Sequence, residues 1–251
     1  MAMVAGLKDF RKQGPPADIG TFQFPATAMV FKFTFSGTEY TVAVASGVGG
    51  WTLIAQSVAG ADNVEINAAI SYVDALGGGD VCLSWGTYDI ADTIYPLSNI
   101  WLRGAGWGTV LKVSDSITCI IINGQASAKE NITISNLNID GNSRLGYHGI
   151  QCTYECMNIT IQNNWVHHVE QLGICIFGGT DASYSKRILI AHNFCGPYNR
   201  DGIAGDDYHI EIDIIGNTCY LNADFGIGFA RNIGRVNVVG NILLGNEQSY
   251  I

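Results

Sequence analysis

The strongest constraint on the fold is a short apolar phrase that recurs five times between residues 131 and 244. The copies start at positions 132, 159, 188, 212 and 236, and each of the last four is followed by an asparagine five positions after its first residue. A period in the twenties indicates a solenoid, in which stacked coils share one continuous core. The copies are Ile132-Thr133-Ile134, Ile159-Thr160-Ile161, Ile188-Leu189-Ile190, Ile212-Asp213-Ile214 and Val236-Asn237-Val238, and the asparagines are Asn164, Asn193, Asn217 and Asn241.

A second phrase, Gly-Ile, keeps its own register and locates two insertions. It occurs at Gly149, Gly173, Gly202 and Gly226, once in each period of the solenoid. Measured against this register, about three extra residues fall within 142–147 and about five within 178–186. Loops raised beside a flat strand face form a groove, and loops carry function more often than the scaffold that supports them. We therefore expect a functional site between the two insertions.

The alternation of side chains along a strand separates inward from outward positions. The branched aliphatic residues of both phrases are predicted to point inward, and the asparagine series to form an internal amide ladder. Cys195 and Cys219 occupy the same position in two successive coils and are predicted to stack as small buried side chains. On the outside, Arg187, Glu211 and Arg235 are predicted to form an alternating charge ladder that is structural rather than functional.

The outward neighbours in the Gly-Ile strands are small or uncharged. They are Gln151, Cys175, Ala204 and Gly228, and glycines flank them. A flat, nearly bare floor of this kind suits a polysaccharide chain lying along it, or close packing of another protein chain.

The chain divides into three regions. Residues 1–20 are polar and rich in turn formers, and we predict a flexible or partner-docked arm. Residues 21–60 are predicted to form a small β-rich appendage, and residues 61–251 the solenoid. Because Ile251 stands where the next Gly-Ile strand after Ile227 would begin, we expect the C-terminal coil to be open, capped by another chain, or truncated.

Local patterns refine the N-terminal part. The alternation of Phe31, Phe33 and Phe35 predicts a hairpin with one packed face. The stretch from Asp62 to Leu76 predicts one amphipathic helix that covers the open first coil. Asp62 is predicted to cap this helix, with Glu65 completing a capping box.

The composition excludes two classes of partner. The 251 residues carry 13 Lys and Arg against 22 Asp and Glu, a formal net charge of −9. An acidic chain is poorly suited to the phosphate backbone of nucleic acids or to anionic lipid surfaces. No apolar run is long enough to span a bilayer, and the first residues lack the pattern of a secretory signal. We therefore expect no nucleic-acid partner and no membrane insertion. The seven cysteines are an odd number, so at least one lies outside any intrachain disulfide.

Three stretches carry a resemblance to a known group of proteins. They are Asp62-Asn-Val-Glu-Ile-Asn-Ala-Ala-Ile70, Gly77-Gly-Gly-Asp-Val-Cys-Leu-Ser-Trp-Gly-Thr-Tyr-Asp-Ile90 and Asn99-Ile-Trp-Leu-Arg-Gly-Ala-Gly-Trp-Gly-Thr-Val-Leu-Lys112. This opening resembles that of the pectate-lyase-like superfamily, whose members are right-handed parallel β-helix proteins found among secreted bacterial proteins and phage tailspikes. The resemblance covers residues 61–251 and implies an all-β fold with an N-terminal capping α-helix. It does not select an activity, because the same opening recurs in lyases, hydrolases, epimerases and non-catalytic virion proteins.

Four aspartates stand beside the expected groove. Asp201 and Asp224 are diagonal neighbours in adjacent coils, and Asp206 and Asp207 follow the far end of the same strand. Paired carboxylates could hydrolyse a glycoside, one as acid and the other as base or nucleophile. They could instead hold a Ca²⁺ ion that neutralises a uronate during β-elimination, with an arginine or histidine as base. The alternative is that they are ordinary turn aspartates.

The remaining candidates would bind substrate. These residues are Tyr147, His148, Gln151, Phe177, Arg200 and Arg231. No metal site is assigned: the adjacent His167 and His168 are expected to point apart. Beyond Ca²⁺, no cofactor is expected.

The leading functional hypothesis is an extracellular or virion-surface protein of the tailspike kind that engages polysaccharide. The N-terminal appendage would serve attachment, and a homotrimer would cap the open coil. The alternative is a polysaccharide lyase or glycoside hydrolase that acts on an acidic glycan, with the four aspartates near its centre. A third hypothesis is a purely structural surface protein.

Overall fold

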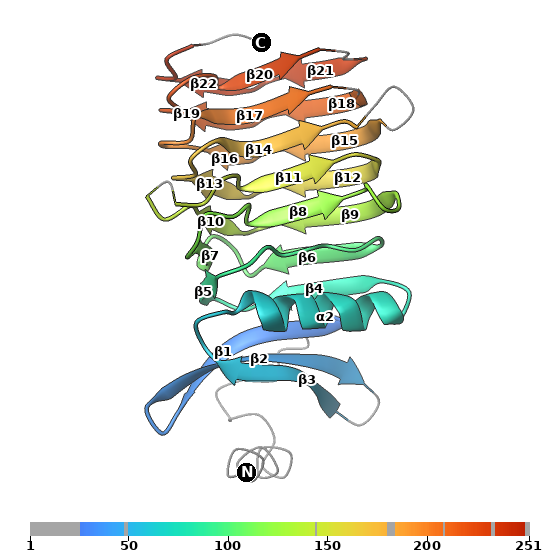
Figure 1. The fold of residues 1–251 in the computed structure, drawn as a ribbon, viewed down its shortest axis with the longest axis vertical. Coiled ribbons are helices and arrows are strands. Elements are labelled where there is room, and N and C mark those ends of the chain that lie inside the picture. Colours follow the sequence, from blue (N-terminus) through green and yellow to red (C-terminus); the bar gives the residue numbers. More distant parts are fainter. Residues whose placement is uncertain are drawn as a thin grey trace.

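A computed structural model describes residues 26–47, 50–143, 145–179, 184–207, 209–231 and 234–248. The predicted arm at 1–20 lies outside the described residues. Strands stack as coils along the long axis of the molecule, with β1 to β3 at one end and β20 to β22 at the other (Figure 1). The sequence prediction of an all-β solenoid with one helix near its start is confirmed for the part of the chain described here.

Three sheets form the walls of the solenoid, and from β9 onward the chain visits them in the repeating order A, B, C. Sheet A contains β1 (Ala28–Phe35), β2 (Thr38–Gly47), β3 (Gly50–Val58), β4 (Gly79–Leu83), β6 (Ile100–Gly104), β9 (Lys129–Ser135), β12 (Cys156–Gln162), β15 (Ser185–Ala191), β18 (His209–Ile215) and β21 (Val236–Val239). Sheet B contains β5 (Gly86–Ile90), β7 (Thr109–Val113), β10 (Asn138–Asp140), β13 (Trp165–His167), β16 (Phe194–Cys195), β19 (Thr218–Tyr220) and β22 (Ile242–Leu244). Sheet C contains β8 (Ile120–Asn123), β11 (Ile150–Thr153), β14 (Leu172–Phe177), β17 (Asp201–Asp206) and β20 (Ile227–Ala230).

The strand register confirms the repeat read from the sequence. From β4 onward every pairing between coils is parallel, as crossover connections in a right-handed parallel β-helix require. Ile159 pairs with Ile132 on one side and with Ile188 on the other, and all three are buried. Cys195 pairs with Cys219, and all seven cysteines are buried and free. The core is therefore a set of stacked rows, each made of one residue type or its close substitutes.

The predicted amide ladder is present at the turn between sheets A and B. The backbone N–H and side-chain amide of Asn164 donate to Oδ1 of Asn193 at 3.0 and 3.1 Å. Asn193 donates in the same two ways to Asn217 at 2.9 and 3.0 Å, and Asn217 to Asn241 at 2.8 and 2.9 Å. Each side-chain amide also reaches a carbonyl of the preceding coil, as Asn193 does at Ile161, 2.8 Å away. The ladder thus satisfies turn groups that burial would otherwise leave unpaired.

The prediction of an alternating charge ladder on the outside of sheet A is wrong. Within the described residues no ion pair joins Arg187, Glu211 and Arg235. Arg187 Nε instead donates to Asn158 Oδ1 at 2.6 Å, and the Asn158 amide donates to Asn131 Oδ1 at 3.0 Å. The physical reason is backbone conformation: φ lies between 55° and 60° at positions 131, 158, 187 and 211. Side chains at such a kink do not project as they would from a regular strand.

The β-rich N-terminal strands extend sheet A. β2 pairs antiparallel with both β1 and β3, and β1 pairs in parallel with β4. The predicted hairpin and its turn at Ser36 and Gly37 are present, but the packed face is not the phenylalanine face. Ala28 and Val30 are buried in the common core, whereas Phe35 on the opposite side is 60% exposed.

Helix α2 (Asn63–Ala75) lies across the first coil, as predicted, but its start is not a capping box. The side chain of Asp62 makes no capping bond. Its carboxylate instead accepts the Thr41 hydroxyl at 2.5 Å and the Asp89 backbone N–H at 2.7 Å, and pairs with Lys32 at 2.9 Å. Glu65 is buried, and burial raises its pKa. Long-range partners thus replace the local cap.

Candidate functional site

A groove runs along the outer surface of sheet C. Its floor is a row of outward-facing residues that pair from coil to coil: Ile121, Gln151, Cys175, Ala204 and Gly228. Toward the C-terminal coils this face opens into a hollow of about 430 Å³. The hollow is lined by Tyr147, His148, Gln171, Leu172, Phe177, Arg200, Asp201, Ala204, Gly205, Asp206, Phe225, Gly228, Phe229 and Ala230.

The floor of this groove is not bare, which corrects the sequence prediction. Cys175 and Ala204 form a small buried cluster with Leu172, and Phe177 packs against it. The Phe225 ring lies so close to Gly228 that a Cβ there would meet it at 3.3 Å. Aromatic and aliphatic side chains from the strand ends therefore cover the small residues and form the apolar walls of the hollow.

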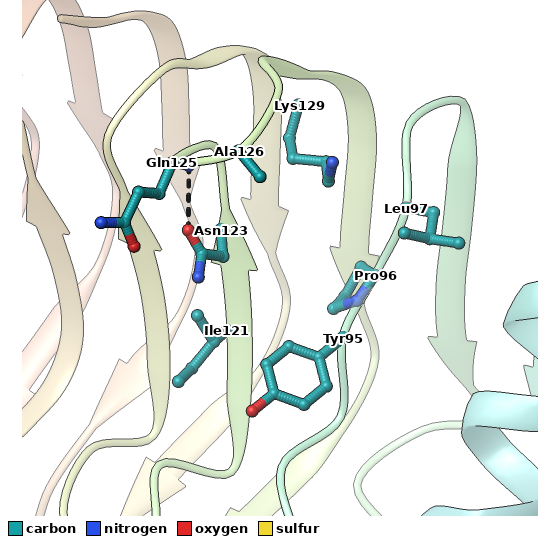
Figure 2. A pocket seen from close by; sticks show the side chains of 8 residues that line it. All are labelled: Tyr95, Pro96, Leu97, Ile121, Asn123, Gln125, Ala126 and Lys129. Carbon is teal, nitrogen blue, oxygen red and sulfur yellow. Dashed lines mark hydrogen bonds between the residues drawn. The ribbon is translucent and has the colours of Figure 1, made fainter. Parts of the chain in front are cut away.

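A second hollow lies on the same face, nearer the N-terminal coils. It measures about 280 Å³ and is lined by Tyr95, Pro96, Leu97, Ile121, Asn123, Gln125, Ala126 and Lys129 (Figure 2). The Asn123 side chain accepts the Gln125 backbone N–H at 2.9 Å, which fixes the loop at its rim. Because Ile121 belongs to the same floor row as Gly228, the two hollows lie along one line. Four strand spacings separate these residues, about 19 Å.

His148 is a neutral imidazole in the wall of the larger hollow. It is 6% exposed, and its Nδ1 accepts the Leu172 backbone N–H at 3.2 Å. Its ring meets those of Tyr147 and Phe177, with centroids 4.4 and 5.9 Å away. Burial, with a smaller contribution from the Arg200 cation, lowers the pKa of His148 to about 4. Because Nδ1 accepts the Leu172 N–H, the proton of the neutral ring is on Nε2, which could donate a hydrogen bond to a sugar hydroxyl.

Asp201 is a carboxyl group with a raised pKa in the same hollow. It is 6% exposed; Oδ1 accepts the Phe225 backbone N–H at 3.1 Å, and Oδ2 lies 3.6 Å from an Arg200 nitrogen. Burial raises the pKa of Asp201, Asp224 adds to this effect, and the Phe225 N–H and Arg200 partly offset it. Asp201 stands two coils from His148 in the register, about 10 Å at the backbone.

Asp206 and Asp207 are held by an arginine. Arg231 binds both oxygens of Asp206 and lies 3.5 Å from Asp207. This contact lowers the pKa of Asp206, against a smaller opposing effect of its burial. A carboxylate paired in this way is a poor proton donor. Asp206 therefore lines the hollow as an arginine-paired carboxylate and not as a proton donor.

Comparison with solved structures identifies the fold. The chain resembles a protein of Geobacillus virus E2 (ORF18), with a TM-score of 0.62, 18% identity and coverage of 80% of this chain and 48% of that one. It also resembles the mannuronan C-5 epimerase AlgE4 A-module of Azotobacter vinelandii, with a TM-score of 0.60, 20% identity and coverage of 73% of this chain and 55% of that one. It also resembles the tailspike protein gp49 of the Acinetobacter baumannii bacteriophage Fri1, described as a capsular polysaccharide depolymerase, with a TM-score of 0.59, 15% identity and coverage of 78% of this chain and 44% of that one. The chain has the right-handed parallel β-helix fold of these proteins.

The chain spans about half the length of these three proteins. No protein-family model and no curated protein sequence matches it. In the described residues, no helix has the length and apolar character needed to cross a membrane.

Six of the ten predicted site residues line the larger hollow of the β-helix, and four do not. Those present are Tyr147, His148, Phe177, Arg200, Asp201 and Asp206. Gln151 lies in the floor row between the two hollows, and Arg231 is held at the rim with Asp207. Asp224 lies next to the hollow, where one of its oxygens is buried without a hydrogen-bond partner in the described structure. Residues 180–183 of the second predicted insertion lie outside the described residues.

The sequence prediction missed three contributors to this site. Gln171 accepts a hydrogen bond from the Arg200 guanidinium and so orients it. Phe225 and Phe229 supply much of the apolar wall. The Gly-Ile register itself places Phe225 in the same row as His148 and Asp201, and Gln171 in the row of Tyr147 and Arg200, but the predicted set of site residues did not include them.

The pKa of His148 predicts acid sensitivity of the fold. An unfolded histidine titrates near 6.5, so between pH 6.5 and 4 the unfolded chain binds more protons and stability falls as pH falls. From pH 7 to pH 4.5 the histidine accounts for a loss of about 2–3 kcal/mol. Burial also lowers the pKa of His167 and of His209, so these histidines add to the loss of stability at low pH. Burial raises the pKa of Asp201, so this carboxyl group has the opposite effect on stability. Urea midpoints of wild type and His148→Gln at both pH values isolate the contribution of His148; equal losses in the two proteins would contradict it.

Proposed function

We propose that this protein binds polysaccharide in the groove of sheet C, as an extracellular or virion-surface β-helix protein of the tailspike kind. The observation that carries the proposal is the line of two hollows along one face. A span of about 19 Å accommodates an extended glycan better than a compact metabolite. Proteins of similar fold include a tailspike described as a capsular polysaccharide depolymerase and a mannuronan epimerase module. Both are described as acting on polysaccharides, which supports the proposal.

The chemistry of the larger hollow fits a sugar. Tyr147 is 45% exposed and Phe177 lies beside the same hollow, so aromatic faces are available to stack on the apolar face of a pyranose. Arg200 and Gln171 provide polar groups at the edge, and Asp201 and His148 provide two more in the wall. A few polar groups set in apolar walls are typical of ligand pockets. Arg200 would pair with the carboxylate of an acidic sugar.

A second candidate function is cleavage of that glycan, and Asp201 favours it. A carboxyl group whose pKa is raised by burial can carry the proton that a leaving glycosidic oxygen needs. In a hydrolase the second carboxylate would be Asp224, its neighbour in the next coil. In a lyase an added cation such as Ca²⁺ would neutralise the uronate, and Arg200 would be the candidate base, because the Nδ1 lone pair of His148 already accepts the Leu172 N–H.

One experiment separates these functions. A panel of neutral and uronate-containing polysaccharides, with and without Ca²⁺, is tested for retention of the protein by affinity electrophoresis and for cleavage. Ultraviolet-absorbing unsaturated ends indicate a lyase, and new reducing ends without absorbance indicate a hydrolase. Cleavage that is lost in Asp201→Asn while retention persists assigns an enzyme, and retention without cleavage assigns a binding protein. No retention of any polysaccharide would reject the proposal and leave a purely structural role.

The assembly state belongs to the same proposal. Tailspike-like attachment suggests a homotrimer, in which neighbouring copies or other subunits cover the last coil. Light scattering of the purified chain measures its mass; a monomeric mass would reject the trimer without affecting the groove.

A further inference from the structure

A cluster of two histidines and an aspartate lies on sheet B, away from the groove. Asp140 at the end of β10 pairs in the register with His167 at the end of β13, and His168 follows in the turn. One ligand atom from each of the three lies within 4.8 Å of the other two. The expectation that adjacent histidines point apart is wrong here, because a φ of 58° at His168 turns its ring back toward His167.

A buried asparagine fixes which nitrogen of His167 is free. His167 Nε2 lies 2.8 Å from the side-chain oxygen of Asn138, which can only accept, so Nε2 carries the proton. Asn138 is 8% exposed, so this partner is held in place. The Nδ1 lone pair of His167 is then directed at Nδ1 of His168, 2.5 Å away. An imidazole oriented through its other nitrogen is the usual arrangement of a metal-binding histidine.

The third group completes a set of donors for one cation. Asp140 Oδ1 lies 3.8 Å from His167 Nδ1 and accepts the Asn142 backbone N–H at 2.8 Å, which holds the carboxylate in position. Metal–nitrogen and metal–oxygen bonds of about 2.0–2.2 Å would be reached by small side-chain rotations that open the contact between the two histidine nitrogens.

The donor set selects the class of metal. Two imidazole nitrogens and one carboxylate suit Zn²⁺ and similar transition metals, whereas Ca²⁺ and Mg²⁺ prefer oxygen ligands throughout. Asp140 and His168 are half-buried, so a fourth position would face solvent and could take water or a ligand. The rings of Trp165 and Tyr198 lie 4.4 Å from His167 and 5.1 Å from His168, centroid to centroid, and wall the site on two sides.

We propose that Asp140, His167 and His168 form a binding site for one divalent transition-metal ion of the Zn²⁺ class. The metal would link two successive coils and leave one coordination position open. This site is independent of the proposed polysaccharide groove, because it lies on a different sheet and shares no residue with it.

Equilibrium dialysis of the full chain against Zn²⁺, with metal analysis, tests the site. We expect about one equivalent per chain. Asp140→Asn retains an oxygen that can accept the Asn142 N–H, and His168→Asn tolerates the left-handed backbone, so both variants should fold. Each should weaken Zn²⁺ binding at least about tenfold. The matched control is His192→Asn, at an exposed turn with a φ of 55°, which should bind as wild type does.

Co²⁺ provides a readout of the ligands themselves. Visible d–d absorption on adding Co²⁺ to wild type, absent in His168→Asn and retained in His192→Asn, would support the site. Wild type that binds no more Zn²⁺ than His168→Asn, or binding lost equally in the control, would overturn it. The close contact of the two histidines would then be an ordinary hydrogen bond through a shared proton.

Discussion

Asn193→Ala should destabilise the β-helix by about 3–5 kcal/mol, because it breaks the amide ladder in its middle. The substitution removes the acceptor of two N–H groups of Asn164 and the donor to the Ile161 carbonyl. Asn164 is fully buried, so these groups have no access to solvent. Each unpaired buried group costs about 1–3 kcal/mol. Urea unfolding followed by circular dichroism measures the change as a shift in midpoint.

Asn237→Ala is the matched control for this prediction. Asn237 lies on β21 of the same solenoid, but its side chain is exposed. Surface substitutions of this kind usually change stability by about 0.5 kcal/mol or less. If both variants unfold at the wild-type urea midpoint, the hydrogen bonds of the asparagine series do not stabilise the fold.

Asp62→Ala should also cost about 3–5 kcal/mol, because it removes the buried counterion of Lys32 and leaves that ammonium only the exposed Glu39. The buried Asp62 carboxylate joins Lys32 of β1, Thr41 of β2 and the backbone of Asp89 in β5. It therefore ties the N-terminal strands to the first coil beneath helix α2. Without it, the Lys32 ammonium, whose side chain is only 10% exposed, loses its buried counterion. The same urea experiment measures the loss.

Glu39→Gln tests whether charge alone explains that result. Glu39 also pairs with Lys32, at 3.2 Å, but its side chain is 52% exposed. An exposed pair contributes less than about 1 kcal/mol, so this variant should unfold close to wild type. Equal losses in Asp62→Ala and Glu39→Gln would show that Asp62 does not act as a buried connection.

Periodicity made the fold predictable from the sequence. The pairings of Ile159 with Ile188 and of Cys195 with Cys219 follow from counting residues, because parallel coils place equivalent positions one strand spacing apart. The same counting placed His148 and Asp201 on one face. Fold, register and the location of the groove therefore all come from one repeated length.

Features that depend on local backbone angles or distant partners could not be predicted in the same way. Asp62 has the sequence pattern of a helix cap, but Lys32 and Thr41 from another part of the chain take its oxygens. His168 adopts a left-handed conformation that the residue type permits but does not require, and this decides where its ring points.

The contents of the groove were predictable only in part. Repeat counting identifies which residues share a row, but not how large side chains at the strand ends fold over it. Phe177 and Phe225 cover a floor that reads as small residues in the sequence. Asp206 has the sequence context of a catalytic acid, but Arg231 from the next coil neutralises it. Such pairings are set by side-chain reach across coils and require the three-dimensional structure.

A comparison of affinities shows whether the groove over sheet C holds a polysaccharide. Using a polysaccharide retained in the panel, calorimetry compares wild type with Tyr147→Ala and Arg200→Ala, both at exposed positions of the groove, and with Phe35→Ala, an exposed aromatic on β1. Each groove variant should bind about tenfold more weakly, a loss of about 1.4 kcal/mol, while Phe35→Ala binds as wild type does. Unchanged affinity in both groove variants, or an equal loss in Phe35→Ala, would contradict polysaccharide binding in the groove.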